Sequence, residues 1–244
     1  MGKSGEGGFS LDRSANWSWV PKLTLGVRMI LCCYLVTLYA CTSSTVPVLE
    51  PVDKKTVAEK GIPVLYRPLL VEDFLATSPP SDGVDRAHRL NAHTGVSIRT
   101  QKGSGYLLSE EMIDGKKMCR GELQNLKFEA VMLPELSWWN PVVENNRRDY
   151  VLQHEQIHFA IMEREALSLN RRVAQESGRM VVVGEECGEV KRKLNRFLDD
   201  LLAQSQKQVE QLHSQFDKET SGQFAPVVQN RWYRKMTTAM ESLK

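Results

Sequence analysis

The longest hydrophobic patterns of the chain lie in its C-terminal half and repeat at helical spacing. Residues 147–174 contain no glycine or proline, and their apolar residues fall on more than one side of the expected helix. A helix that is apolar over most of its circumference is expected to be buried at the centre of a domain. Two further long helices are predicted over residues 190–216 and 226–243, the last of which begins with a proline.

Shorter patterns that are typical of strands lie mainly before this central helix. Residues 95–100 alternate between apolar and polar, and residues 126–133 place four apolar side chains on one face. A short apolar run at residues 62–65 opens the domain, residues 180–183 suit a short buried strand, and residues 138–141 suit an aromatic loop. Because strands precede helices rather than alternating with them, the order predicts an α+β fold. We expect a small, mostly antiparallel sheet packed on the buried helix, plus two further long helices.

The N-terminal segment has a different character. A basic flank precedes an apolar run over residues 29–40. Twelve residues span only about 18 Å as a helix, which is shorter than the roughly 30 Å core of a bilayer. A basic flank, a short apolar run and a small residue before a break are typical of a secretory signal. The break at residues 38–41 resembles a bacterial lipobox in which Cys41 is lipidated, so we expect a signal peptide over residues 1–41; the alternative is an uncleaved membrane anchor that starts near Leu23.

The rest of the chain is expected to form a tether and one domain. Residues 42–60 contain proline, serine and threonine, which suits a tether between membrane and domain. Residues 61–244 have a length that suits a single domain. Thr42, rather than aspartate, after the cysteine favours the outer membrane of a Gram-negative cell. We therefore expect an exported protein of the cell envelope, held at the outer membrane by an N-terminal lipid anchor and facing the periplasm.

Composition and cysteine usage agree with an exported globular domain. Hydrophobic residues make up 41% and charged residues 25% of the chain, as in ordinary globular proteins. The net charge of +2 and the lack of a basic stripe interleaved with aromatics argue against a nucleic-acid partner. Beyond the N-terminal segment only Cys119 and Cys187 remain, and an oxidising compartment favours a disulfide between them. The alternative is two unrelated buried cysteines.

Residues 154–158 read His-Glu-Gln-Ile-His within the predicted central helix. His154 and His158 are offset by about 40° around the helix axis and by roughly 6 Å along it, so both imidazoles project from one face. A tetrahedral Zn²⁺ ion can accept both at about 2.0–2.1 Å. Glu155 lies beside that face, where it can act as the general base toward a zinc-activated water. The pattern therefore predicts a zinc hydrolase; the alternative is two ordinary histidines on a solvated helix face.

A third metal ligand is not evident near the two histidines. The helix continues with apolar residues, and Glu163 points about 140° away from His158 on an ideal helix. The ligand must come from another segment, and the end of the second long helix offers three candidates: His213, Asp217 and Glu219. Glu185, Glu186 and Glu189 are weaker candidates, since they also suit a solvated surface.

Several separated motifs together resemble one bacterial family. They are Asp73-Phe74, Ser137-Trp138, residues 154–159 with Glu163, and residues 216–220 followed by Gln229 and Trp232. The combination resembles the predicted secreted zinc-dependent proteases grouped as domain of unknown function 922, over about residues 61–240. The resemblance implies a zinc site and an export signal. The family usually has a His-Gly pair after the threonine segment, whereas Thr220-Ser221-Gly222 has the glycine without the histidine. If that histidine is the family's third ligand, His213, Asp217 or Glu219 has to replace it.

The sequence thus predicts a membrane-anchored, zinc-dependent peptidase with a zincin-like metalloprotease domain at residues 61–244. His154 and His158 bind Zn²⁺, Glu155 is the general base, and the substrate is a peptide or protein. A non-catalytic envelope lipoprotein that keeps the fold as a binding or scaffold module is the main alternative. A zinc hydrolase acting on another amide or ester, such as a cell-wall peptide, is a further one.

Overall fold

The computed structural model describes residues 47, 49, 57–80, 91–176, 181–221 and 223–244. The predicted signal peptide of residues 1–41, with its lipidation site Cys41, lies outside the described residues. So do most of the predicted tether of residues 42–60 and Met180, the first residue of the strand predicted over residues 180–183. The chain from Ser44 to Lys244 forms one compact unit. Within the described residues, no helix combines the length and apolarity that a membrane span requires.

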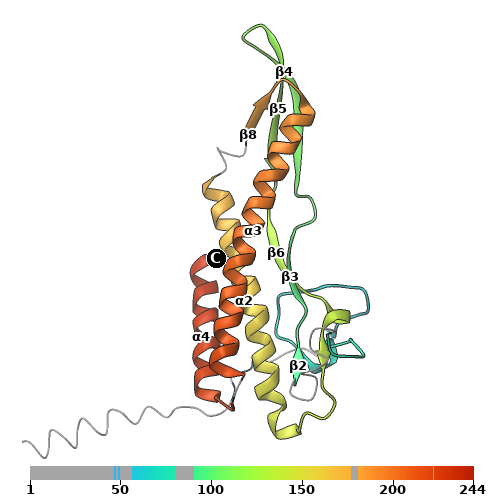
Figure 1. The fold of residues 1–244 in the computed structure, drawn as a ribbon, viewed down its shortest axis with the longest axis vertical. Coiled ribbons are helices and arrows are strands. Elements are labelled where there is room, and N and C mark those ends of the chain that lie inside the picture. Colours follow the sequence, from blue (N-terminus) through green and yellow to red (C-terminus); the bar gives the residue numbers. More distant parts are fainter. Residues whose placement is uncertain (1–46, 48, 50–56, 81–90, 177–180, 222) are drawn as a thin grey trace, which may run out of the picture. The chain divides into compact units, whose positions relative to one another are not determined.

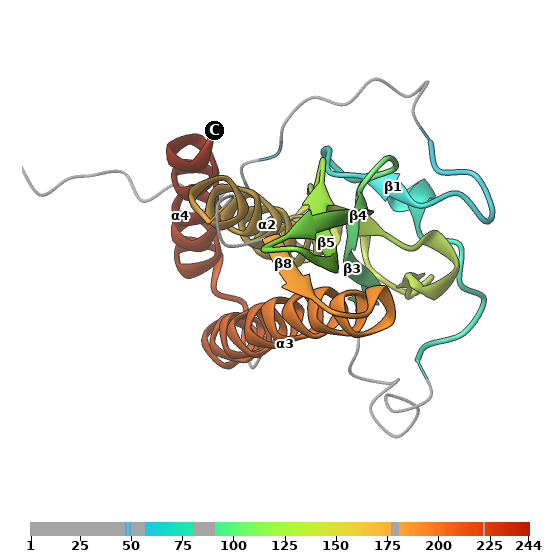
Figure 2. The same ribbon diagram turned by 90° about the horizontal axis from the view of Figure 1, so that it is seen from above.

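Three long helices make up the C-terminal part of this unit (Figure 1). They are α2 (Arg148–Gln175), α3 (Cys187–Thr220) and α4 (Pro226–Leu243). In Figure 2, α2 lies between α4 and the strands, with α3 along one side. Buried residues on several sides of α2 fit its central position, because its apolar residues surround most of the helix. The three predicted helices are confirmed, and α3 extends beyond both of its predicted ends.

The strands form three small antiparallel sheets rather than one. The first has the order β1-β6-β3, the second pairs β2 with β7, and the third has the order β4-β5-β8. Their bounds are β1 Val64–Leu65, β2 Ala92–His93, β3 Val96–Thr100, β4 Gly105–Ile113, β5 Lys116–Gln124, β6 Phe128–Met132, β7 Trp138–Trp139 and β8 Val181–Gly184. Among the described residues, β3 pairs with β6 alone and is an edge strand of the first sheet.

Two features of the strands differ from the prediction. Residues 138–141 are predicted to be a loop, but Trp138 and Trp139 form β7 and pair with β2. Trp138 is buried, and the ring of Trp139 lies 5.5 Å from that of Phe74, so both indoles pack in the core. The hairpin of β4 and β5 is not predicted at all. Its strands carry many charged residues because most of their side chains are exposed, and this weakens the alternating pattern.

Two buried polar side chains hold the first segment of the domain: Asp73 orders the segment itself, and Gln156 attaches it to α2. Asp73 is fully buried and accepts two hydrogen bonds of 2.8 Å from the guanidinium of Arg67, as well as two from backbone N–H groups. Gln156, the middle residue of the His-Glu-Gln-Ile-His motif, accepts a hydrogen bond of 2.6 Å from the backbone N–H of Leu69. Gln156 therefore anchors α2 to the first segment of the domain.

The first residues of α3 are attached to the third sheet. Cys187 forms a disulfide with Cys119 of β5, as predicted, and the two Cα atoms are 5.1 Å apart. Val190 and Leu194 are buried against the same strand. Farther along, α3 packs on α2 and α4. The helix is thus held near both ends, and its last turns are positioned by the main core.

A methyl group at Gly121 of β5 would collide with α3. An ideal Cβ there lies 2.4 Å from Cγ1 of Val190 and 2.9 Å from Cδ2 of Leu108. We therefore expect Gly121→Ala to lower the free energy of unfolding by about 1–3 kcal/mol, as overpacking does in other cores. Urea denaturation would measure the change. The control is Gly105→Ala in the adjacent strand β4, where no heavy atom lies within 4 Å of the added Cβ. Similar changes in the two variants would contradict the tight packing of α3 on this sheet.

Candidate metal centre

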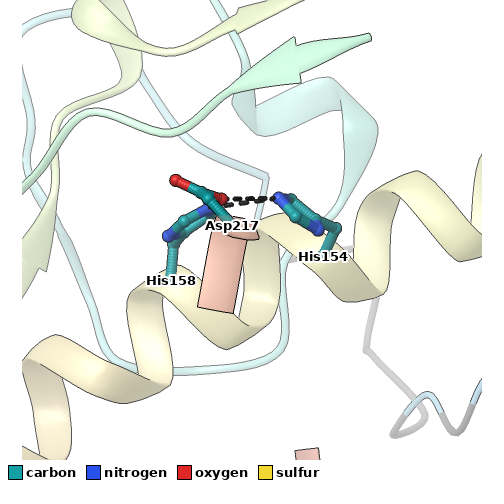
Figure 3. Close-up of side chains that lie close together, drawn as sticks. All are labelled: His154, His158 and Asp217. Carbon is teal, nitrogen blue, oxygen red and sulfur yellow. Dashed lines mark hydrogen bonds and ion pairs between the residues drawn. The ribbon is translucent and has the colours of Figure 1, made fainter. Parts of the chain in front are cut away.

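Two histidines of α2 and one aspartate of α3 converge on a single point (Figure 3). Oδ1 of Asp217 lies 3.3 Å from Nε2 of His154 and 3.2 Å from Nε2 of His158. The two Nε2 atoms are 3.2 Å apart. The histidines share one face of α2, as their four-residue spacing predicts, and the end of α3 brings the carboxylate opposite them.

This triangle has the size that a tetrahedral metal ion requires. When metal–ligand bonds measure about 2.0–2.1 Å, ligand atoms in a tetrahedral site are separated by about 3.3–3.4 Å. The three measured separations are 3.2, 3.2 and 3.3 Å. A cation would also stabilise two ring nitrogens and a carboxylate oxygen directed at one point. His154, His158 and Asp217 can therefore hold a metal ion.

The candidate third ligands have different positions. Asp217 joins the two histidines, whereas His213, one turn earlier on α3, places its Nδ1 at 2.7 Å from Nδ1 of His158, on the other side of that ring. Glu219 is directed elsewhere, since its carboxylate accepts hydrogen bonds from Trp232 (2.8 Å) and Gln215 (3.0 Å). Two residues beyond Asp217 correspond to about 200° around a helix. The structure thus brings Asp217 to the histidines and does not bring Glu219 there.

Phe216, the neighbour of Asp217 in the sequence, packs directly against the two histidines. Its fully buried ring lies 4.5 Å from the ring of His154 and 5.1 Å from that of His158. On the far side it contacts Trp232, with ring centroids 5.5 Å apart. Because Phe216 packs between the imidazoles and Trp232, it holds this turn of α3 against the two histidines.

The electrostatics of the cluster favour an ionised carboxylate. Burial alone would raise the pKa of Asp217, but hydrogen bonds from His154 and His158 and their charges hold it well below its usual range. For His158, burial acts to lower the pKa, yet the hydrogen bond to Asp217 and the charges of Glu155 and Asp217 raise it overall. Burial, and then the neighbouring His158, lower the pKa of His213 to about 4. At neutral pH Asp217 is therefore anionic and His213 uncharged.

Glu155 lies beside His154 and is almost completely buried. Its Oε2 accepts a hydrogen bond of 2.5 Å from Oγ1 of Thr94, which lies between β2 and β3. The next residue, Gly95, donates its backbone N–H to Oγ of Ser137 at 3.0 Å, so the turn that carries Thr94 is itself held. Thr94 is not predictable from the sequence, because it is 61 residues from Glu155 and a threonine before a glycine is no signal for such a contact.

The ligand group and Glu155 line one cavity of about 1240 Å³. Residues 94–98, which include the start of the edge strand β3, line it, as do α2 between His154 and Met162 and α3 between Leu202 and Asp217. His93 of β2 and Glu210 of α3 line the same cavity. Among the described residues, the cavity therefore lies between the edge strand β3 and the helices α2 and α3.

Comparisons with known proteins do not indicate a function for this site. The chain matches no family model, no curated protein and no solved structure. Its function is accordingly inferred from the chemistry of the site.

Proposed function

We propose that the protein is a zincin-like, zinc-dependent peptidase in which His154, His158 and Asp217 bind Zn²⁺ and Glu155 is the general base. The close triangle of two Nε2 atoms and one Oδ1 atom beside a buried carboxylate carries the proposal. Nitrogen and oxygen donors in a triangle of this size suit Zn²⁺. Three protein ligands with an open fourth position are typical of catalytic zinc sites, whereas structural sites are closed by four.

The residues of the centre have separate roles in peptide hydrolysis. A bound zinc ion supplies Lewis acidity, which polarises the scissile carbonyl and lowers the pKa of a water molecule to about 7. His154 and His158 bind through Nε2, and Asp217 contributes the anionic ligand. Glu155 accepts the proton of the attacking water and transfers it to the leaving amine. Thr94 keeps the carboxylate of Glu155 in place through its hydrogen bond of 2.5 Å.

The cavity suits an extended peptide. One wall includes the edge strand β3, whose partner in the described part of the chain is β6 on its other side. An extended chain can add to such an edge through main-chain hydrogen bonds. A peptide bound in this way would run along the cavity that holds the ligand group. The cavity therefore favours a peptide or protein substrate over a small ester or amide.

The proposed cellular context rests on the N-terminal segment. Export through a signal peptide, lipidation of Cys41 and attachment to the outer membrane remain predictions, because residues 1–46 lie outside the described part of the chain. The disulfide between Cys119 and Cys187 supports an oxidising compartment, since such bonds are rare in the cytosol.

A mixed peptide library tests the proposal. We expect the full-length protein, loaded with zinc, to cleave members of the library, with the products identified by mass spectrometry. A chelator should remove the activity, and added zinc should restore it. Stoichiometric zinc without cleavage of any peptide would instead support the non-catalytic binding or scaffold module. Cleavage that survives complete removal of metal would contradict the mechanism.

A further inference from the structure

His158 contacts a second imidazole on the side opposite its proposed metal-binding nitrogen. Nδ1 of His158 and Nδ1 of His213 are 2.7 Å apart, and the ring centroids lie 4.9 Å apart. At this distance one nitrogen must carry a hydrogen and the other must present a lone pair. One of the two Nδ1 atoms is therefore the donor of this hydrogen bond and the other is its acceptor.

The direction of this hydrogen bond follows from the proposed function, on which the inference rests. To bind zinc, Nε2 of His158 has to present its lone pair, so the proton of the neutral ring resides on Nδ1. Nδ1–H of His158 then donates to Nδ1 of His213, and His213 carries its own proton on Nε2. The opposite direction would place a proton on Nε2 of His158, where it would point at the ion.

We propose that His213 is a positioning residue that selects the metal-binding tautomer and the ring orientation of His158. Ligand histidines are usually oriented by a carboxylate, a backbone carbonyl or water. Here a second imidazole occupies that position. His213 and Asp217 are four residues apart and share one face of α3. One face of α3 thus supplies a ligand to the ion and orients another ligand on α2.

Zinc affinity tests this role without the use of enzymatic activity. For full-length variants, the zinc Kd is measured by competition with a chromogenic chelator. We expect His213→Ala to weaken zinc binding by about 10- to 100-fold, the usual effect of losing such a partner. His213→Gln should recover most of the affinity, because its side-chain oxygen can accept the same hydrogen bond. His93→Ala, at another histidine of the cavity, is the matched control and should stay within about threefold of the wild type.

Co²⁺ substitution separates a positioning role from direct ligation. The visible absorption of Co²⁺-saturated His213→Ala and wild-type protein should coincide, because the ligand set is unchanged. A zinc Kd for His213→Ala within threefold of the wild type would overturn the proposal. So would a spectrum that shows the loss of a ligand. Weakened zinc binding together with no peptide cleavage would refute the peptidase proposal alone, whereas a wild-type protein that binds no zinc would refute both.

Discussion

Asp217→Ala is expected to weaken zinc binding by more than about 100-fold, beyond the range for loss of a hydrogen-bonding partner. The variant removes the sole anionic member of the proposed ligand set and leaves two imidazoles without the oxygen that lies 3.2–3.3 Å from each. Asp217→Asn keeps the size of the side chain but removes its charge, so we expect a loss that is smaller but still large. The zinc content after dialysis and the zinc Kd from chelator competition would be measured for both variants.

Glu219→Ala is the matched control for this prediction. Glu219 is an acidic residue two positions farther along α3, and its carboxylate bonds to Trp232 instead of facing the histidines. Its zinc Kd should stay within about threefold of the wild type. If Glu219→Ala lost the metal while Asp217→Ala retained it, the ligand assignment would be wrong.

Glu155→Gln is expected to reduce kcat by about 1000-fold while zinc content stays stoichiometric, because general-base catalysis contributes roughly 10²- to 10⁴-fold. Glutamine can still accept the hydrogen bond from Thr94, so the loss would report on proton transfer rather than on local structure. A factor of 1000 corresponds to about 4 kcal/mol of transition-state stabilisation. We expect KM to change little, since the carboxylate acts in the transition state rather than in binding. Steady-state kinetics on a cleaved peptide would measure both constants.

The control is Glu210→Gln, which alters another carboxylate of the same cavity, on α3. Its kcat should stay within a few-fold of the wild type, because Glu210 precedes Asp217 by seven residues, about 10 Å along the axis of α3. Equal kcat in wild type and Glu155→Gln would remove the catalytic role of Glu155.

The helices were predictable because their signal is local and long. An apolar pattern at helical spacing over residues 147–174 can be satisfied only by a helix, and α2 spans Arg148–Gln175. The hairpin of β4 and β5 has no such signal. These two strands belong to the third sheet, which packs on α3 through only a few residues such as Val190 and Leu194. Most of their side chains therefore face solvent and are polar. The prediction of a single sheet is wrong for a related reason: which strands pair depends on contacts that are distant in the chain.

The candidate metal centre also combines features that are local in the sequence with features that depend on distant contacts. The sequence alone determined His154, His158 and the neighbouring Glu155 as a group, because a four-residue spacing on a helix places two side chains on one face whatever surrounds it. For the remaining ligand it favoured three residues of another helix, kept three glutamates as weaker candidates, and could not choose among them. That choice required the packing of α3 on α2, with Phe216 between the imidazoles and Trp232.

Tertiary structure alone decided the partners of the site. Thr94 reaches Glu155 across 61 residues of chain, and His213 reaches His158 across 55. Such contacts depend on how strands and helices pack against one another, and spacing along the chain does not encode them. The His-Glu-Gln-Ile-His motif therefore determined which side chains are available as two proposed ligands and a proposed base. The packing of α2, α3 and the turn before β3 decided the proposed third ligand and the hydrogen bonds made by His158 and Glu155.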